Sequence, residues 1–444
     1  MVASTYVLAT SILFAAGHWH WSVREAMLPR VNDVIVFTFF AVCGGSVGSF
    51  LNVVVWRMPQ GLSVNGHSFC PRCRSQLRAR DNVPVFGWLF LGGRCRDCRL
   101  PISSRYPIVE AAVAITFALI GLLELYGWNL PYRPYPFHDA MAMPRISPES
   151  VLTSLYHLVG LAIAWAMGLI RYDRNPIPMR LVTFAGIWLI GGIVLIPSLA
   201  IVPWQLTLPE DWVSIFDPYA RLGLRETITQ NFMKGDALVQ TLVRVATALV
   251  AAGFFARVLA RAFCPEADLK TDPLSGQTRR LLDLVGMFSV VALIVGWQST
   301  SGVLLAASIL ACLAKRWLVE KNGDTPAATD AMGRFSLMLP VALSLQVLFW
   351  RPLMEWGYWP SAPLNFSSAS ESIRASAYEG LGMGSSRGTI LWFAFATLFT
   401  PLWLREPRPH QSEAPINEDE DESNSIETLS DQPPVYESAS DEVN

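Results

Sequence analysis

Long apolar segments are the feature that most restricts how this chain can fold. A helix needs about 20 mostly apolar residues to cross the hydrocarbon core of a lipid bilayer. Nine clear segments lie at 34–56, 107–127, 151–170, 181–203, 237–257, 284–298, 299–315, 336–352 and 388–404. A weaker segment, residues 5–21, is either a further span or an uncleaved signal-like segment. We therefore predict an all-α polytopic membrane protein with about 9 to 10 transmembrane helices.

The composition agrees with a membrane protein. The chain is 52% hydrophobic and 16% charged, whereas soluble globular domains are usually about 25% charged. The lipid bilayer is therefore an expected partner, and nucleic acid is not. Nothing in the sequence specifies the oligomeric state.

Charged residues predict which loops face the cytoplasm. The loop 57–106 contains nine arginines and two aspartates, and short cytoplasmic loops carry an excess of basic residues. The C-terminal tail, residues 405–444, contains twelve Asp or Glu residues and is expected to be disordered and solvated. Alternation of the predicted spans places both this loop and the tail on the cytoplasmic side.

Two sequence details predict local structure within the spans. Residues 284–298 and 299–315 are short and meet at the polar stretch Gln298–Gly302, which favours a tight helical hairpin. Gly44, Gly45, Gly48 and Ser49 place small residues about one helical turn apart. Such spacing is typical of helices that pack closely in a membrane.

Four of the seven cysteines form two C-x-x-C pairs in the arginine-rich loop. Cys70 and Cys73 are followed after 21 residues by Cys95 and Cys98. This spacing fits tetrahedral ligation of a structural Zn²⁺ by four thiolates. Two disulfides are the alternative, but disulfides rarely persist in the reducing cytoplasm. A domain of about 50 residues has too small a core to fold alone, so metal binding would decide whether it folds.

The residues around the cysteines follow a recognisable order. Gly48–Val54 and Arg57–Pro59 precede the first pair, Arg80–Leu89 lies between the pairs, and Pro101–Glu110 follows the second. This order resembles the N-terminal part of the type IV prepilin leader peptidases over residues 44–115. The match is specific, because each segment keeps its spacing from the cysteines.

The resemblance implies a function. Family members are polytopic aspartic proteases that cut the short basic leader from type IV pilin or pseudopilin precursors at the cytoplasmic face of the bacterial inner membrane. Many also methylate the new terminus with S-adenosylmethionine, although no G-x-G-x-x-G fingerprint supports this activity independently. The alternative is a catalytically inactive homologue that acts as a scaffold or assembly factor for pili or type II secretion.

The apolar segments, the charge distribution and the resemblance together predict how the chain is organised. The expected parts are an N-terminal segment 1–33, a peptidase N-terminal region 34–127 with the cysteine loop 57–106, a divergent membrane aspartic peptidase region 151–317, additional spans 318–404, and the acidic tail 405–444.

Both catalytic motifs of the family are altered in this chain. Counting back from Ile177-Pro178, Arg171 stands where the first family aspartate is expected, and Asp173 lies two residues further on. The second aspartate normally ends a G-x-G-D motif, but the nearest acid to that position is Asp283. Asp173 and Asp283 could form a displaced catalytic dyad at the cytoplasmic face. Alternatively, each is an interfacial acid paired with a neighbouring arginine such as Arg174 or Arg280.

Overall fold

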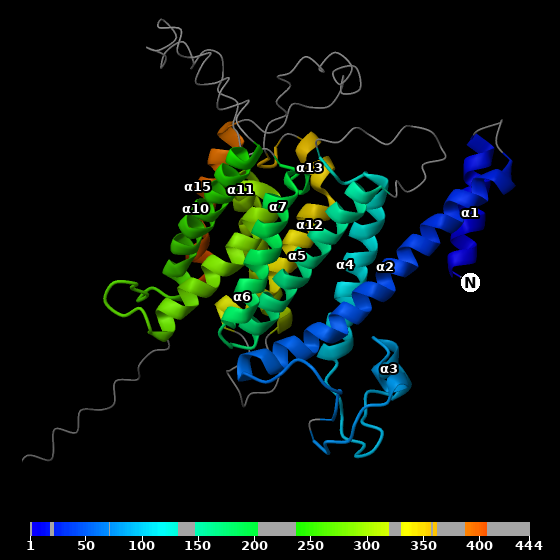
Figure 1. Cartoon of the computed structure of the whole chain (residues 1–444), viewed down its shortest axis with the longest axis horizontal. Helices are drawn as coiled ribbons and strands as arrows, with labels where there is room; N and C mark the ends of the chain where they lie inside the picture. The colour runs from blue at the N-terminus through cyan, green and yellow to red at the C-terminus, as the bar shows by residue number, and fades with distance from the viewer. Residues whose placement is uncertain are drawn as a thin grey trace, which may run out of the picture. The chain divides into compact units, whose positions relative to one another are not determined.

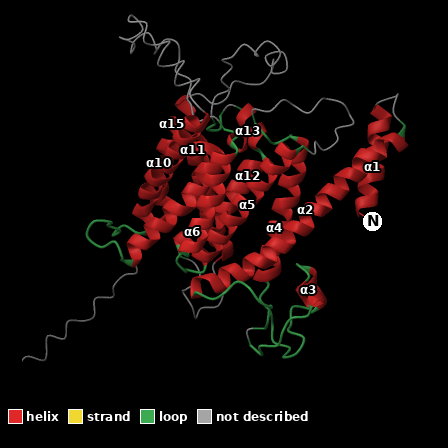
Figure 2. Cartoon of the chain, in the orientation of Figure 1, coloured by secondary structure: helices red, strands yellow, loops and turns green. Residues whose placement is uncertain are grey.

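The computed structural model is helical almost throughout the part it describes (Figure 2). The described residues are 2–17, 22–70, 72–131, 147–202, 237–318, 330–356, 358–361 and 387–405. The predicted loop 204–236 and all of the acidic tail except Arg405 lie outside these residues. Instead of strands, the described residues contain two isolated β-bridges, both beside the cysteines.

The apolar segments predicted from the sequence are helical (Figure 1), although the segment 181–203 is divided into short α-, π- and 3-10-helical pieces. The helices named below are α1 Val2–Gly17, α2 Val23–Arg57, α3 Phe86–Phe90, α4 Arg105–Tyr126, α5 Pro148–Tyr172, α6 Met179–Gly186, α7 Gly192–Leu195, α10 Ala237–Phe263, α11 Gly276–Leu318, α12 Ala331–Leu348, α13 Trp350–Glu355 and α15 Arg387–Leu404. Among the described residues, six helices are long and apolar enough to span a membrane, and three shorter apolar helices accompany them. The prediction of an all-α polytopic membrane protein is confirmed.

Helix α11 is broken at one glycine. Its 43 residues would form a straight rod of about 64 Å, roughly twice the thickness of a bilayer core. Gly296 has φ 80° and ψ 157°, a backbone conformation that glycine adopts without a steric penalty. The predicted division into two helical segments is therefore confirmed, with the break two residues before Gln298.

Small residues let α2 and α4 approach each other closely. A β-carbon on Gly44 would lie 2.6 Å from Phe117 Cβ, and one on Gly48 would lie 2.8 Å from Glu110 Cα. These separations are shorter than a van der Waals contact, so glycine is required at both positions. The predicted packing role of these glycines is confirmed, and the α2–α4 pair carries the cysteine loop at one end.

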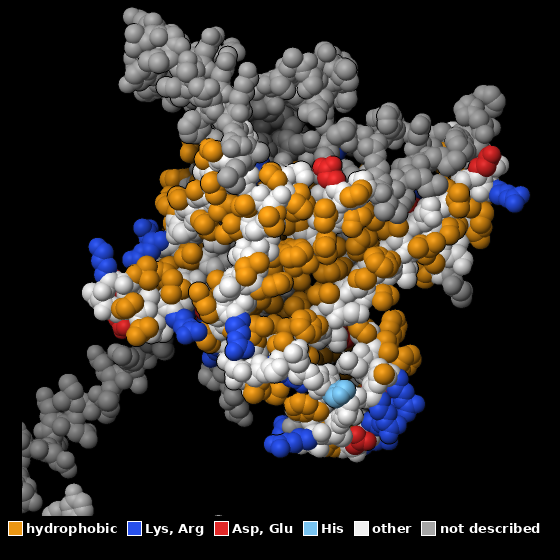
Figure 3. All heavy atoms as spheres, viewed as in Figure 1, with side chains coloured by type: hydrophobic (Ala, Val, Ile, Leu, Met, Phe, Trp, Pro, Cys, Tyr) orange, Lys and Arg blue, Asp and Glu red, His pale blue; other side chains and the backbone are white. Residues whose placement is uncertain are grey.

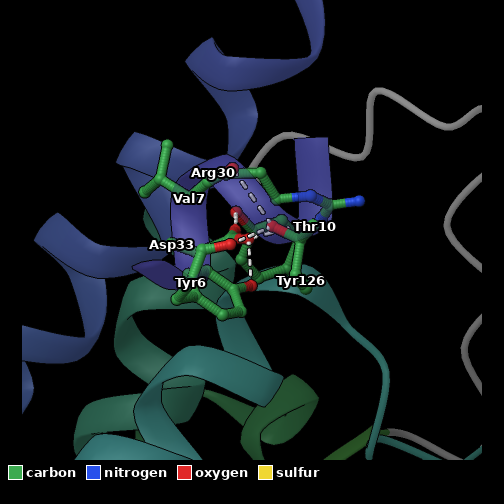
Figure 4. Close-up of polar contacts among 6 residues, drawn as sticks. All are labelled: Tyr6, Val7, Thr10, Arg30, Asp33 and Tyr126. Atoms are coloured by element: carbon green, nitrogen blue, oxygen red, sulfur yellow. Dashed lines mark hydrogen bonds and ion pairs between the residues drawn. The ribbon is translucent and has the colours of Figure 1, made fainter. Parts of the chain in front are cut away.

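A carboxylate within α2 ties three helices together (Figure 4). Asp33 is buried and accepts hydrogen bonds from the hydroxyls of Tyr6 in α1, at 3.0 Å, and of Tyr126 in α4. Arg30, one turn earlier in α2, forms an ion pair with it at 3.4 Å. An acidic side chain in a membrane helix is costly unless it is paired in this way. The cluster therefore fixes α1 against the α2–α4 pair.

Candidate functional site

Residues 58–104, called the cysteine domain below, contain four cysteines that converge on one point. Cys70 Sγ lies 3.9 Å from Cys98 Sγ, and Cys73 Sγ lies 3.9 Å from Cys95 Sγ. All four sulfur atoms lie within 4.8 Å of one another, and none is in a disulfide. The two-disulfide alternative is therefore wrong for this structure.

The backbone builds the two halves of this cluster in the same way. The Arg74 N–H donates to Cys70 O at 2.9 Å, and the Arg99 N–H donates to Cys95 O at 3.0 Å. Arg74 and Arg99 have φ angles of 56° and 59°, which turn each chain segment back after its second cysteine. The repeated turn aims both sulfurs of each pair at a common centre.

The geometry fits a tetrahedral metal ion. Four thiolates about 2.3 Å from Zn²⁺ would be separated by roughly 3.8 Å, close to the 3.9 Å found for two sulfur pairs. A hydrogen bond with the Ser75 hydroxyl lowers the pKa of Cys73 to about 6, whereas burial and hydrogen bonds with the other cysteines raise the pKa of Cys98 to about 11. The thiolate that a metal requires therefore forms more readily at Cys73 than at Cys98. Four protein ligands leave no open position, so such a site would be structural.

An ion pair connects the two halves of the cysteine domain. Asp81 accepts from Arg96 Nε at 2.9 Å and from a second guanidinium nitrogen of the same side chain. The Arg96 guanidinium holds the pKa of the Asp81 carboxyl below its usual range. Arg96 lies between Cys95 and Cys98, so this contact joins the second cysteine pair to the loop before α3.

A cavity of about 220 Å³ opens between the cysteine domain and the ends of α2 and α4. Half of its lining residues are apolar or aromatic and half are polar or charged, with three acids and two arginines among the charged ones. The lining includes Asn52, Trp56, Phe69, Trp88, Tyr106 and Glu110. The sequence did not predict this cavity, although the matching segments Gly48–Val54, Arg80–Leu89 and Pro101–Glu110 supply ten of its 22 lining residues.

The first candidate catalytic acid, Asp173, is held by an arginine distant in the sequence. Asp173 follows the last turn of α5, and its two carboxylate oxygens accept from Arg105 Nη1 at 2.5 Å and Nη2 at 2.8 Å. Arg105 begins α4 and lies over the Tyr172 ring. This pair therefore connects the end of α5 to the start of α4 beside the cysteine domain.

The second candidate, Asp283 in α11, is paired with Arg171. Arg171 Nη1 lies 3.5 Å from Asp283 Oδ2, and both side chains are buried, with 3% and 6% of their surface exposed. The Ile177 N–H donates to Asp283 Oδ1 at 3.2 Å. Arg171 also donates to the carbonyl oxygen of Asn175 at 2.9 Å. Arg171 stands where the first family aspartate is expected, and Asp283 is the acid nearest to the expected position of the second. These two residues thus form an ion pair with each other.

The structure corrects the arginine partners expected for both acids. Asp173 pairs with Arg105 rather than Arg174, and the ion pair of Asp283 is with Arg171 rather than Arg280. Both acids lie near the turn between α5 and α6, because Asp173 opens this turn and Ile177 binds Asp283. No hydrogen bond between Asp173 and Asp283 occurs among the described residues, so each carboxylate has a separate cationic partner.

Comparison with known proteins agrees with the sequence resemblance. Residues 42–123 match the family model described as the bacterial peptidase A24 N-terminal domain. The chain is 42% identical over 111 residues to a type 4 prepilin-like proteins leader peptide-processing enzyme of Escherichia coli, covering 20% of this chain and 41% of that protein. Two proteins named prepilin leader peptidase/N-methyltransferase are also similar. That of Myxococcus xanthus is 36% identical over 156 residues, which is 33% of this chain and 46% of the relative.

The prepilin leader peptidase/N-methyltransferase of Klebsiella pneumoniae is 45% identical over 112 residues, which is 23% of this chain and 49% of the relative. The chain therefore spans somewhat less than half the length of the curated relatives it matches. No solved structure matches the chain. The matched region contains the four cysteines, the cavity lining and Arg105, but neither Asp173 nor Asp283. Residues 42–123 are therefore similar to the N-terminal domain of bacterial A24 peptidases and to the corresponding part of prepilin leader peptidases.

Proposed function

We propose that this chain is a non-cleaving relative of the prepilin peptidases, which binds type IV pilin or pseudopilin precursors on the side of its cysteine domain. The buried Arg171–Asp283 ion pair is the observation that carries this proposal. We further propose that the protein lies in the bacterial inner membrane, with the cysteine domain on the cytoplasmic side and Zn²⁺ held by the four thiolates.

The ion pair conflicts with the chemistry of an aspartic protease. In such a site two close carboxylates share one proton, so that one acts as a base on water and the other as an acid on the substrate carbonyl. An arginine side chain stays protonated and can accept no proton. Arg171 therefore cannot replace the first aspartate, and Asp283 has this arginine beside it instead of a second carboxylate.

The displaced dyad of Asp173 and Asp283 is the second candidate. Its support is that both acids lie near the turn between α5 and α6. For this dyad to act, Arg105 and Arg171 would both have to release their carboxylates when substrate binds. The non-cleaving proposal needs no such rearrangement, and for that reason it is preferred.

The cavity is the proposed place of precursor binding. It combines aromatic side chains with the carboxylate of Glu110, which suits a peptide that carries basic residues next to an apolar segment. S-adenosylmethionine is a proposal that rests only on the names of relatives such as the Myxococcus xanthus protein. Titration of the purified protein with this compound, with and without zinc, tests it.

The test of precursor binding uses a peptide and a variant in which the substituted side chain keeps nearly the same shape. A fluorescent peptide containing a prepilin leader and the adjoining apolar residues is titrated with the full-length protein in detergent. Glu110→Gln removes the charge of the side chain but keeps an oxygen that can accept from the Val85 N–H. We expect about tenfold weaker binding, equivalent to roughly 1.4 kcal/mol.

The matched control removes an acid elsewhere. Asp268 is an exposed carboxylate between α10 and α11, and Asp268→Asn should leave the affinity for the peptide unchanged. Equal affinity of the parent and Glu110→Gln would place the peptide outside the cavity. Absence of binding by the parent protein would reject the proposed function.

A further inference from the structure

Helix α3 exposes an apolar face. Phe86, Leu89 and Phe90 have 57%, 56% and 81% of their surface exposed. Their spacing of three and four residues places them on one side of the helix, and the rings of Phe86 and Phe90 stack with centroids 6.3 Å apart. Three large apolar side chains on a single short helix are unfavourable in water.

The loop that leads into α3 packs against α2 and α4 well inside the end of this helix pair. Asn52 Nδ2 donates to Tyr106 O at 3.3 Å, so the start of α4 is level with Asn52 of α2. Gly45 lies seven residues before Asn52, which is about 10 Å along the helix. A β-carbon on Gly45 would lie 3.2 Å from Pro84 Cβ. Pro84 is therefore about 10 Å inside the level at which α4 begins.

The backbone of this loop is satisfied at that depth. The Val85 N–H donates to Glu110 Oε2 at 2.6 Å, one turn into α4. Irregular backbone is tolerated inside a membrane only where protein groups satisfy it. The contact thus permits the chain to dip between α2 and α4 immediately before α3 begins.

The domain that carries the apolar face also exposes many basic side chains. Six arginines of the cysteine domain are exposed, and a seventh, Arg96, is paired with Asp81. The exposed arginines are Arg72, Arg74, Arg78, Arg80, Arg94 and Arg99. Figure 3 shows basic side chains grouped directly beside hydrophobic ones on the lobe that contains the cysteines. Figure 1 shows α3 beyond the lower end of α4, and Phe86, Leu89 and Phe90 are exposed there.

We infer that α3 is a lipid anchor, whose face of Phe86, Leu89 and Phe90 inserts into the bilayer leaflet nearest the cysteine domain while the exposed arginines contact anionic headgroups. An apolar helical face next to a basic rim is the combination that binds an anionic membrane surface. The anchor would hold the cysteine domain against the membrane and fix one side of the cavity, because Asn82, Val83 and Trp88 line it.

The experiment places a photoreactive residue on this face. Full-length protein with Phe90→p-benzoylphenylalanine is reconstituted in nanodiscs of phosphatidylcholine and phosphatidylglycerol, irradiated, and examined by mass spectrometry for lipid adducts. The matched control carries the same residue at Asp97, an exposed acid between two cysteines of the same domain. The positive control carries it at Phe50, which is 51% exposed on α2.

We expect position 90 to give lipid adducts at a yield similar to position 50 and about tenfold above position 97. Among those adducts, phosphatidylglycerol should be enriched over its share of the nanodisc, because the arginines attract anionic lipid. A yield at position 90 equal to that at position 97 would overturn the proposal. So would adducts with protein in place of lipid, which would identify a second chain as the occupant of this face.

Discussion

Cys95→Ser is expected to abolish stoichiometric zinc binding and to unfold the cysteine domain while the membrane helices remain folded. Metal binding contributes about 10–16 kcal/mol in small four-ligand zinc domains, so the loss of one thiolate removes most of the free energy that folds the domain. Cys95 is the buried one of the four cysteines. Zinc per chain by mass spectrometry and protease sensitivity of residues 58–104 in membranes measure the two effects.

A cysteine outside the cluster provides the control. Cys312 lies in α11, where its only described contact is a long one, at 3.9 Å, to the carbonyl oxygen of Trp403. Cys312→Ser should keep one zinc per chain and the protease resistance of the parent. Full zinc occupancy in Cys95→Ser, together with an intact cysteine domain, would show that the four sulfurs do not act as one structural site.

Asp283→Asn is expected to lower the free energy of unfolding by about 3–5 kcal/mol. The substitution leaves the guanidinium of Arg171 buried without an opposite charge, and a buried uncompensated charge is far more costly than a missing pair. Asp173→Asn changes the same functional group, but Asp173 and Arg105 are partly exposed, at 24% and 38% of their side-chain surface. Its loss should cost about 1 kcal/mol or less. Apparent Tm values in detergent compare the two variants.

A double variant distinguishes the loss of the whole ion pair from the loss of one of its charges. Arg171→Met with Asp283→Leu removes both charges together, and replacement of a buried ion pair by apolar groups is often neutral. The double variant should therefore recover most of the stability lost in Asp283→Asn. Equal Tm values for Asp283→Asn and Asp173→Asn would contradict the buried ion pair.

Much of the fold could be predicted because its signals are local in the sequence. The apolar segments are helical, since length and hydropathy suffice to define a membrane span. The glycines of α2 indicated close packing, and Gly48 indeed meets Glu110 of α4. The four cysteines converge because the spacing of two C-x-x-C pairs already restricts their geometry.

The partners of the candidate acids could not be predicted in this way. Sequence proximity suggested Arg174 for Asp173, but the observed partner Arg105 is 68 residues away and comes from another helix. Arg171 and Asp283 likewise meet only because α5 and α11 pack together. The insertion of Pro84 between α2 and α4 has the same origin, since tertiary packing and not local pattern places it there.

Cleavage of a type IV prepilin by the unmodified protein, in a bacterial strain that lacks its own prepilin peptidase, tests the central claim most directly. We predict that the precursor keeps its leader peptide and that it co-purifies with the full-length chain, because Asp283 is ion-paired with Arg171 and not placed beside a second carboxylate. Production of mature pilin that is lost in both Asp173→Asn and Asp283→Asn would contradict this account and establish the displaced dyad.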